Sequence, residues 1–269
     1  MAGGRATYSD FLQLDTLLDL QRTLHDPPQR DELLFIVIHQ VSELWLKLMH
    51  HELVEARREI AGDQLPQALK HFARVKAVQE QLIAAWKVLN TMTPADYLEF
   101  RDALGTSSGF QSWGYRLVEY ILGNKDAAYL DVHRHDTAIV ARLDAALAEP
   151  SLYDEVLRLL ARRGFALPDE LLERDWCQPL AGHPAAVEAW LKVYKHPRDH
   201  WDLYDLGEKL MDMEGLFQRW RFDHMSAVER VIGHQPGTGG SAGVAFQKKA
   251  LDRRFFHDLY EVRNRLIYG

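Results

Sequence analysis

The sequence predicts an all-α protein that folds as a single domain over residues 1–269. Long runs of the chain repeat apolar residues every three to four positions, which is the period of a helix with one buried face. Runs that alternate apolar and polar residues, as half-buried strands do, are nearly absent. No change in composition, internal repeat or low-complexity stretch divides the chain, so a second domain is not expected.

Nine stretches carry the helical period, and signals for helix starts and stops agree with several of their ends. Thr93 before Pro94 combines a capping hydroxyl with a proline at the first helical position, and Ser151 opens another helix. Gly233 is a stop signal, and the stretch 165–183 has the weakest pattern and is predicted to be a connection. The predicted helices span residues 29–60, 64–91, 94–102, 110–122, 136–147, 151–163, 184–195, 200–232 and 252–266.

Composition and charge predict a folded, soluble protein. The chain is 47% hydrophobic and 26% charged, with a formal net charge of −7 at pH 7. No basic run stands apart from nearby acids, which argues against a nucleic-acid partner. The single cysteine, Cys177, cannot form an intramolecular disulfide and fits a reducing compartment. No secretion signal and no apolar run of membrane length is visible, so the sequence predicts a cytoplasmic protein with no membrane partner.

A histidine lies on the buried stripe of a long helix, just ahead of a glycine-rich loop. His224 occupies a position where the helical period asks for leucine. A buried imidazole needs a partner, and a metal ion is one candidate. Glycines at 233, 237, 239, 240 and 243 would let the loop approach a ligand closely, although a flexible surface loop is equally compatible with the pattern. The apolar members of the stripe are Leu206, Leu210, Met213, Phe217, Trp220 and Val228.

A second histidine, His39, lies within the most apolar helix of the chain. Residues 33–45 are apolar nearly all round, which predicts that most of this segment is buried. Phe35 lies one turn before His39 and shares its face of the helix. By itself the pattern leaves open whether His39 contacts a ligand or is a core histidine hydrogen-bonded to a neighbour.

Residues that could recognise a carboxylate lie between positions 97 and 109. Tyr97 and Arg101 are four positions apart, which predicts two side chains on one face of a short helix. An arginine fork can bind a carboxylate through two parallel hydrogen bonds, and the alternative is a surface packing pair. Ser108 and Gly109 precede the next helix, where a small hydroxyl residue is usually an N-cap and could also donate to a ligand anion.

The other histidines suggest no further site. His50 and His51 precede Glu52, but no second Glu-x-x-His motif and no His-Glu-x-x-His motif completes a metal site. The histidines that lie among polar residues, and are therefore predicted to be solvated, are His133, His135, His196 and His200.

Taken together, these ordered segments resemble the tryptophan 2,3-dioxygenase family. The resemblance implies an all-helical bundle domain that encloses one b-type haem per subunit. It also implies an enzyme that uses O₂ as a cosubstrate and opens the C2–C3 bond of the indole of L-tryptophan, giving N-formyl-L-kynurenine in the first step of the kynurenine route of tryptophan catabolism. The resemblance is weakest over 130–200, and the segments that carry it are 8–15, 35–48, 92–101, 108–112, His224 and 237–243.

The resemblance also implies roles for single residues. His224 corresponds to the ligand of the haem iron, and Trp86 to a residue near a haem propionate. His39 corresponds to the residue that hydrogen-bonds the indole N–H, while Arg101 and Thr238 correspond to residues that hold the carboxylate and ammonium end of tryptophan. The implied pocket walls are Phe35 and Tyr97, with Ser108 and Gly109 beside both haem and substrate.

The chain departs from the family pattern at three positions. Ile38 stands where the family usually has glutamine, Val41 where it has threonine, and Phe11 where it has tyrosine. None of these changes removes a group with an implied role, but Phe11 leaves the substrate preference open.

Three other functions compete with the tryptophan reaction. One is a haem enzyme of the same superfamily that hydroxylates another aromatic amino acid or indole. Another is a non-catalytic haem sensor, which the presence of both Arg101 and Thr238 disfavours because a sensor needs no carboxylate site. The last is a helical scaffold without a cofactor.

The amino-terminal segment 1–20 contains an amphipathic stretch at 8–14 that is too short to be a stable helix alone. In the resembled family this segment reaches a neighbouring subunit of a homotetramer. The resemblance therefore implies that Tyr8, Phe11 and Leu12 line the substrate pocket of an adjacent chain, with packing inside the same chain as the alternative.

Overall fold

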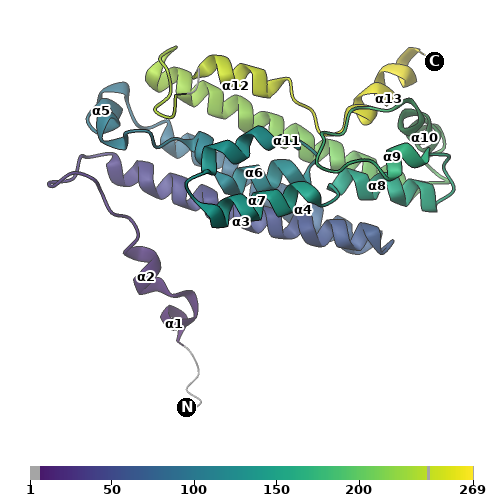
Figure 1. Cartoon of the computed structure of the whole chain (residues 1–269), viewed down its shortest axis with the longest axis horizontal. Coiled ribbons are helices and arrows are strands. Elements are labelled where there is room, and N and C mark those ends of the chain that lie inside the picture. The colour runs from purple at the N-terminus through teal and green to yellow at the C-terminus, as the bar shows by residue number, and fades with distance from the viewer. Residues whose placement is uncertain (1–6, 241–242, 269) are drawn as a thin grey trace.

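The computed structural model describes residues 7–240 and 243–268. Regular structure in this part of the chain consists of helices alone, which confirms the all-α prediction. Three long helices lie along the long axis of the molecule: α3 (Glu32–Ala61), α4 (Leu65–Leu89) and α11 (Trp201–Ile232) (Figure 1). At 1.5 Å per residue, the longest of them extends about 48 Å.

Shorter helices pack around this frame. Helix α6 (Trp113–Ile121) packs on α3, and α7 (Thr137–Ala148) packs on α6. Helix α10 (Pro184–Lys195) packs on α13 (His257–Tyr268) at one end of the molecule (Figure 1). The remaining elements are α1 (Tyr8–Leu12), α2 (Leu14–Leu18), α5 (Pro94–Leu98), α8 (Leu152–Arg162), α9 (Asp169–Leu172) and α12 (Val244–Leu251), with 3-10 turns η1 (Arg101–Leu104), η2 (Gly109–Gln111) and η3 (Ala127–His133).

The predicted helix starts are confirmed where a capping residue marks them. Thr93 accepts from the backbone N–H of Asp96, whose carboxylate accepts from the backbone N–H of Thr93 in return. Ser151 and Asp154 form the same reciprocal cap at the start of α8. Each cap pairs two backbone groups that a helix end would leave without partners.

Three predicted helices differ from the observed ones. The helix predicted over 94–102 ends at Leu98, because the chain turns there and continues as η1. The helix predicted over 110–122 is divided between η2 and α6. The helix predicted over 252–266 corresponds to α13, which begins later, at His257, and α12 before it was not predicted. The chain between α12 and α13 is anchored to α11 by Glu214, which accepts from the backbone N–H groups of Phe255 and Phe256.

The main core forms where α4 packs between α3 and α11. The predicted stripe of α11 faces this core, since Leu206, Leu210, Met213 and Phe217 are all buried. The buried amide of Gln79 on α4 donates to the carbonyl of Met213 on α11 at 3.0 Å. This bond links the two helices in the middle of the core.

The prediction that residues 33–45 are mostly buried is wrong. Four apolar side chains spaced three or four residues apart face outward along α3, and we call them the open stripe. No other part of the described chain covers them, and helical period alone cannot reveal that absence. They are Leu33 (50% exposed), Val37 (37%), Val41 (37%) and Leu44 (50%).

Among the described helices, α3 alone is long and apolar enough to cross a membrane, with a mean hydropathy of 1.2 over its most apolar 18 residues. Only 11% of that window is buried. One such helix is weak evidence for a membrane span, because core helices of soluble proteins meet the same criteria of length and composition.

The prediction that His133 is solvated is also wrong. His133 ends η3, which packs against α7, and its side chain is buried. Burial lowers the pKa of the His133 imidazole below its ordinary value. The polar residues next to His133 in the sequence therefore did not predict that its side chain is buried.

Two glycines of α11 provide a matched test of the packing. A methyl group on Gly207 would lie 2.8 Å from the Tyr194 hydroxyl, which Glu208 holds at 2.7 Å, whereas a methyl group on Gly215 meets nothing within 4 Å. We expect Gly207→Ala to destabilise the protein by about 1–3 kcal/mol through overpacking. Gly215→Ala should stabilise it by about 0.5–1 kcal/mol. Chemical denaturation measures both values, and equal shifts would contradict the packing described here.

Candidate active site

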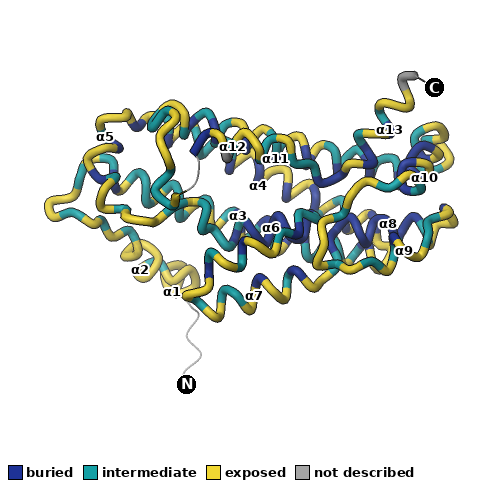
Figure 2. The backbone as a smooth tube through the Cα atoms, turned by 45° about the horizontal axis from the view of Figure 1, so that its top comes forward, coloured by how far each residue is buried: buried dark blue, intermediate teal, exposed yellow. Residues whose placement is uncertain are grey.

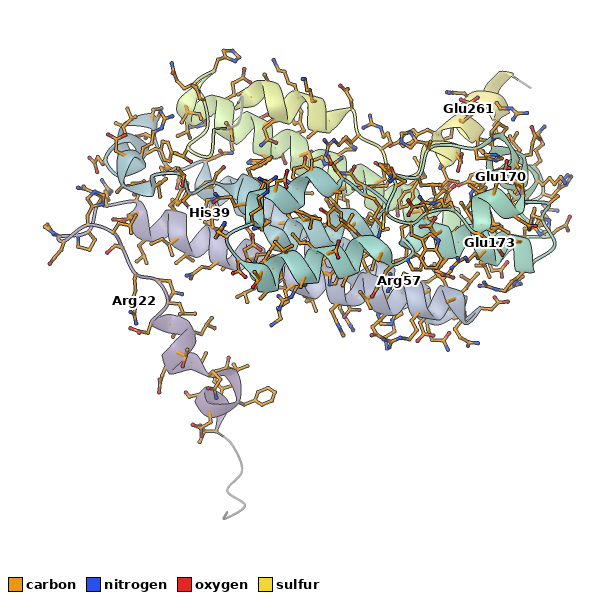
Figure 3. All side chains as sticks on the ribbon, in the orientation of Figure 1. Arg22, His39, Arg57, Glu170, Glu173 and Glu261 are labelled. Carbon is orange, nitrogen blue, oxygen red and sulfur yellow. The ribbon has the colours of Figure 1, made fainter. Side chains whose placement is uncertain are left out.

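One part of the candidate site lies on α3 and contains His39, which Figure 3 labels. The Nδ1 of His39 lies 2.7 Å from the backbone carbonyl of Phe35. Because a carbonyl can only accept, Nδ1 carries the proton and Nε2 presents a free lone pair. Burial lowers the pKa of His39 below 6.5, so the neutral, accepting form prevails at neutral pH.

The second imidazole, His224, lies on α11 where the buried stripe gives way to a partly open face. The pKa of His224 is lowered to about 4. Burial is the larger of the two causes, and the charge of His39 adds to it. His224 is therefore neutral at physiological pH and keeps the lone pair that a metal ligand needs.

Two indole rings flank His224. Trp86 of α4 stacks on it with ring centroids 4.7 Å apart and planes within 8°, and Trp220 of α11 lies 5.6 Å away. The Trp86 Nε1 is buried and has no hydrogen-bond partner among the described residues. An unpaired buried donor is costly and points to a ligand that supplies the acceptor.

Aromatic rings form a wall beside His39. The centroid of Phe35 lies 4.1 Å from that of His39 and 6.1 Å from that of Tyr97, so these three rings lie together. Phe100, which was not among the predicted site residues, lies 5.4 Å from both Phe35 and Tyr97. Phe100 lies three positions after Tyr97, and this spacing could have indicated that the two rings lie close together.

Arg101 does not share a helix with Tyr97, which corrects the sequence prediction, because α5 ends at Leu98 and Arg101 begins η1. Its Nη2 donates to the carbonyl of Pro236 at 2.9 Å. Thr238 donates through its hydroxyl to the carbonyl of Ser107. These two bonds bring the glycine-rich loop beside the η1 segment, so Arg101 and Thr238 belong to one part of the molecule.

Ser108 caps η2, as the simpler sequence interpretation proposed. Its Oγ accepts from the Phe110 N–H at 3.3 Å, and its own N–H donates to Gln111. Gly239 of the loop lies so close to Ser108 that a methyl group on Gly239 would be 2.5 Å from the Ser108 Cβ. Gly109 next to it has open space around its Cα.

The N-terminal residues do not join the site of their own chain. Helices α1 and α2 project away from the bundle (Figure 1), and Figure 2 shows this arm as largely exposed. Tyr8 is 75% and Phe11 78% exposed, and Leu12 is also exposed. Tyr8, Phe11 and Leu12 therefore do not pack against their own chain, which was the alternative prediction. Residues 1–6 of the predicted segment lie outside the described part.

The side chains around Glu52, considered above as a metal site, are engaged in other contacts. The described residues contain no group of three or more His, Cys, Asp or Glu side chains that could hold a metal ion. Glu52, one of the candidates, is instead paired with His71 and Arg74, each at 2.7 Å.

The fold is all-helical, a neutral imidazole at His224 lies beside the unpaired indole N–H of Trp86, and aromatic rings line His39. Such residues can hold a haem, because haem iron takes histidine as a ligand and the porphyrin suits apolar surroundings. Comparison with known proteins defines the family. The family model for tryptophan 2,3-dioxygenase matches residues 1–266, so the chain belongs to the tryptophan 2,3-dioxygenase family.

Curated bacterial relatives support this membership. The chain is 52% identical over 260 residues to the tryptophan 2,3-dioxygenase of Polaromonas sp. (strain JS666), covering 97% of this chain and 88% of the relative. It is 52% identical over 263 residues to that of Myxococcus xanthus, covering 98% and 90%, and 51% identical over 262 residues to that of Serratia proteamaculans, covering 97% and 94%.

Enzymes of this family depend on haem, and the residues present here fit that group. His224 offers a neutral imidazole, and the unpaired Trp86 Nε1 offers a donor that suits a propionate. The apolar surroundings suit a porphyrin ring, and they include Leu34, Phe35, Ile38, Leu89, Met92, Tyr97 and Val231.

The contact between Gly239 and Ser108 can be tested. Gly239→Ala should push the loop away from Ser108 and weaken the Arg101 and Thr238 bonds that hold it. Because each bond contributes about 0.5–1.5 kcal/mol, we expect amide exchange over 233–240 to accelerate roughly 2- to 10-fold. Gly109→Ala is the matched control, since its methyl group meets nothing within 4 Å. Equal exchange in the two variants would contradict the contact.

Proposed function

We propose that this protein is a haem b-dependent dioxygenase that inserts both atoms of O₂ across the indole C2–C3 bond of L-tryptophan, giving N-formyl-L-kynurenine. Membership in the family supports the reaction. The observation that carries the residue assignment is the pair of neutral imidazoles: His224 with a lone pair for iron, and His39 with a lone pair for the substrate.

His224 would hold the haem iron and Trp86 would donate to a propionate. When bound, the haem supplies the activation of O₂, which no amino-acid side chain can provide. The contribution of the protein is then binding, orientation and exclusion of water from the apolar pocket.

His39 would accept a hydrogen bond from the indole N–H through Nε2. The bond from Nδ1 to the Phe35 carbonyl fixes the tautomer that makes Nε2 an acceptor. The lowered pKa makes His39 a weaker base than a free imidazole, and even a free imidazole, with a pKa of about 6.5, could not deprotonate an indole. Its role is therefore orientation of the ring.

Arg101 and Thr238 would hold the amino-acid end of the substrate. The guanidinium can donate two parallel hydrogen bonds to a carboxylate, and the Thr238 hydroxyl lies on the loop that Arg101 already contacts through Pro236. Contacts to both the carboxylate and the ammonium group would fix the orientation of the substrate. Such orientation can lower the activation free energy of the reaction by several kcal/mol.

The comparisons give no support to a hydroxylase or a haem sensor. The decisive experiment is to load the protein with haem, reduce it without oxygen, and then add L-tryptophan and air. Appearance of N-formylkynurenine, with both oxygen atoms derived from labelled O₂, is the expected result. A hydroxylated product, or no product from fully loaded ferrous protein, would overturn the proposal.

Replacement of His224 tests the iron ligand. We expect His224→Ala to fold but to bind haem at least tenfold more weakly and with a changed ferrous spectrum, because the metal bond is lost. His133→Ala is the control, since it removes a buried imidazole whose ring contact is with His135 and not with the rings beside His224. Unchanged haem content and spectrum in His224→Ala would refute the assignment.

Replacement of His39 tests the distal role through pH. The neutral form accepts the indole hydrogen bond, so kcat/KM should be full above the pKa and fall as the pH drops through it, below 6.5. His39→Ser should keep haem, lose about 2- to 12-fold in rate for one hydrogen bond of about 0.5–1.5 kcal/mol, and lose this acidic decline. A pH profile for His39→Ser identical to that of the parent would exclude the role.

We further propose that the protein is a cytoplasmic homotetramer in which the arm of one chain completes the pocket of another. Within the described residues, the arm with Tyr8 and Phe11 and the open stripe of α3 both expose apolar side chains. A groove of about 1040 Å³ runs beside the stripe and includes Leu20, His39 and Leu44 in its walls. Contiguous exposed apolar side chains are typical of interaction surfaces.

The assembly is testable by light scattering. The intact protein should be a tetramer, and Leu44→Glu should dissociate it by placing a charge in the stripe. Trp201→Glu is the control, because Trp201 is 64% exposed but lies outside the stripe and the arm. Removal of residues 1–14 should lower tryptophan turnover at unchanged haem content. A monomer with full activity, or normal turnover after truncation, would exclude the proposal.

A further inference from the structure

We propose that Trp220 is a positioning residue for the haem ligand: its indole, held by Tyr115 and by a buried Arg221–Glu119 ion pair, sets the orientation of the His224 imidazole. This inference rests on the proposed function, in which His224 binds the iron. It assigns a purpose to a buried charged cluster that the proposed reaction otherwise leaves without one.

The first observation concerns what His224 lacks. A histidine that binds a metal usually donates its second ring N–H to a carboxylate or a backbone carbonyl, which fixes the plane of the ring. Within the described part of the chain, His224 makes no such hydrogen bond. Its specific neighbours are the two indoles, Trp86 at 4.7 Å and Trp220 at 5.6 Å. The orientation of this imidazole is therefore determined by packing against flat rings.

The second observation is that Trp220 is itself held by aromatic packing. Tyr115 of α6 lies 5.3 Å from Trp220, and Phe217 and Trp86 lie 6.0 and 5.7 Å from it. Trp220 lies one helical turn before His224 on α11, so the two side chains share a face. A change in the position of Tyr115 would therefore pass through Trp220 to the imidazole.

The third observation is that a fully buried guanidinium holds Tyr115. Arg221 is only 1% exposed. Its Nε donates to the Tyr115 hydroxyl at 3.2 Å, its Nη2 to Glu119 at 3.0 Å, and its Nη1 to the carbonyl of Arg253 at 3.1 Å. Each guanidinium nitrogen thus has an acceptor, and displacement of Arg221 would leave a buried charge unpaired.

Glu119 is fixed in turn from both sides. One carboxylate oxygen pairs with Arg221 and the other with the buried Arg116 of the same helix. The guanidinium of Arg116 lies 3.7 Å from the ring centre of Tyr129 and 4.8 Å from that of Tyr115. The cluster therefore has little freedom to rearrange, which is the property that a rigid support for Trp220 requires.

The support is specific to one side of the imidazole. Trp86 on α4 stacks nearly parallel to His224, whereas Trp220 meets it at 41°. The soft torsions of a histidine are χ1 and χ2, and rotation about either one moves the ring against its flat neighbours. Trp86 and Trp220 are inclined to His224 at different angles, so they restrain the imidazole from two directions.

The experiment measures haem ligation and not only turnover. In Trp220→Leu, transfer of haem to excess apomyoglobin should be at least tenfold faster than in the parent, and the iron–histidine band of the ferrous protein should shift or broaden in resonance Raman spectra. Trp220→Phe keeps a flat ring and should fall between the two. Trp176→Leu is the control, because this half-buried tryptophan packs on Arg158 in another part of the chain.

A second pair of variants tests the buried cluster and covers the case in which Trp220→Leu does not fold. Tyr115→Phe removes the hydroxyl that Arg221 contacts and keeps the ring, so haem transfer should be about threefold faster and the iron–histidine band should shift. Tyr120→Phe removes another hydroxyl of α6, bonded to the Asp126 carbonyl at 2.9 Å, and should leave both readouts unchanged.

The outcomes distinguish this inference from the proposed function. Parent-like haem transfer and an unshifted band in a folded Trp220→Leu would overturn the positioning role, as would identical behaviour of Tyr115→Phe and Tyr120→Phe. If His224→Ala also kept the iron–histidine band, the assignment of the ligand itself would fail. Loss of the band in His224→Ala alone would leave the proposed function intact.

Discussion

The packing of α4 between α3 and α11 is the constraint on which the rest of the structure depends. Helix α3 carries His39, α11 carries His224, and α4 supplies the indole of Trp86 that stacks on His224. The bond from Gln79 to the Met213 carbonyl ties α4 to α11 within the core. A shift of α4 by one helical turn, about 5.4 Å, would remove Trp86 from the imidazole. The apolar core therefore determines the relative positions of the groups proposed to hold haem.

Buried charges extend this constraint to the C-terminal part of the chain. Arg221 donates to the Arg253 carbonyl, and Glu214 accepts from the backbone N–H groups of Phe255 and Phe256. Both charged residues lie on α11, so the helix that carries His224 also anchors the segment after α12. The glycine-rich loop that precedes α12 is held at its other side by Arg101 and Thr238. The proposed haem side and substrate side are thus parts of one connected unit.

The open stripe of α3 shows that the described part of a single chain leaves some of its apolar side chains exposed to solvent. A helix with an exposed row of leucine and valine gains free energy when that row is covered. The arm presents a second uncovered set, including Phe11. Both features follow naturally if several copies of the chain associate, and in that case the unusual apolarity of α3 serves two purposes: one face supports His39, and another contacts a neighbouring subunit.

The sequence predicted the long helices and the caps at Thr93 and Ser151, because the helical period and the reciprocal caps involve residues close together in the chain. It also drew attention to His224, which interrupts a regular apolar stripe. The ends of the helices near 98, 112 and 257 were not predictable, and neither was the covered side of α3, the place of Phe100 in the aromatic wall, the burial of His133 or the contact of Arg101 with the glycine-rich loop. Each of these depends on segments far apart in sequence, and no local pattern records which distant side chain fills the space beside a given residue.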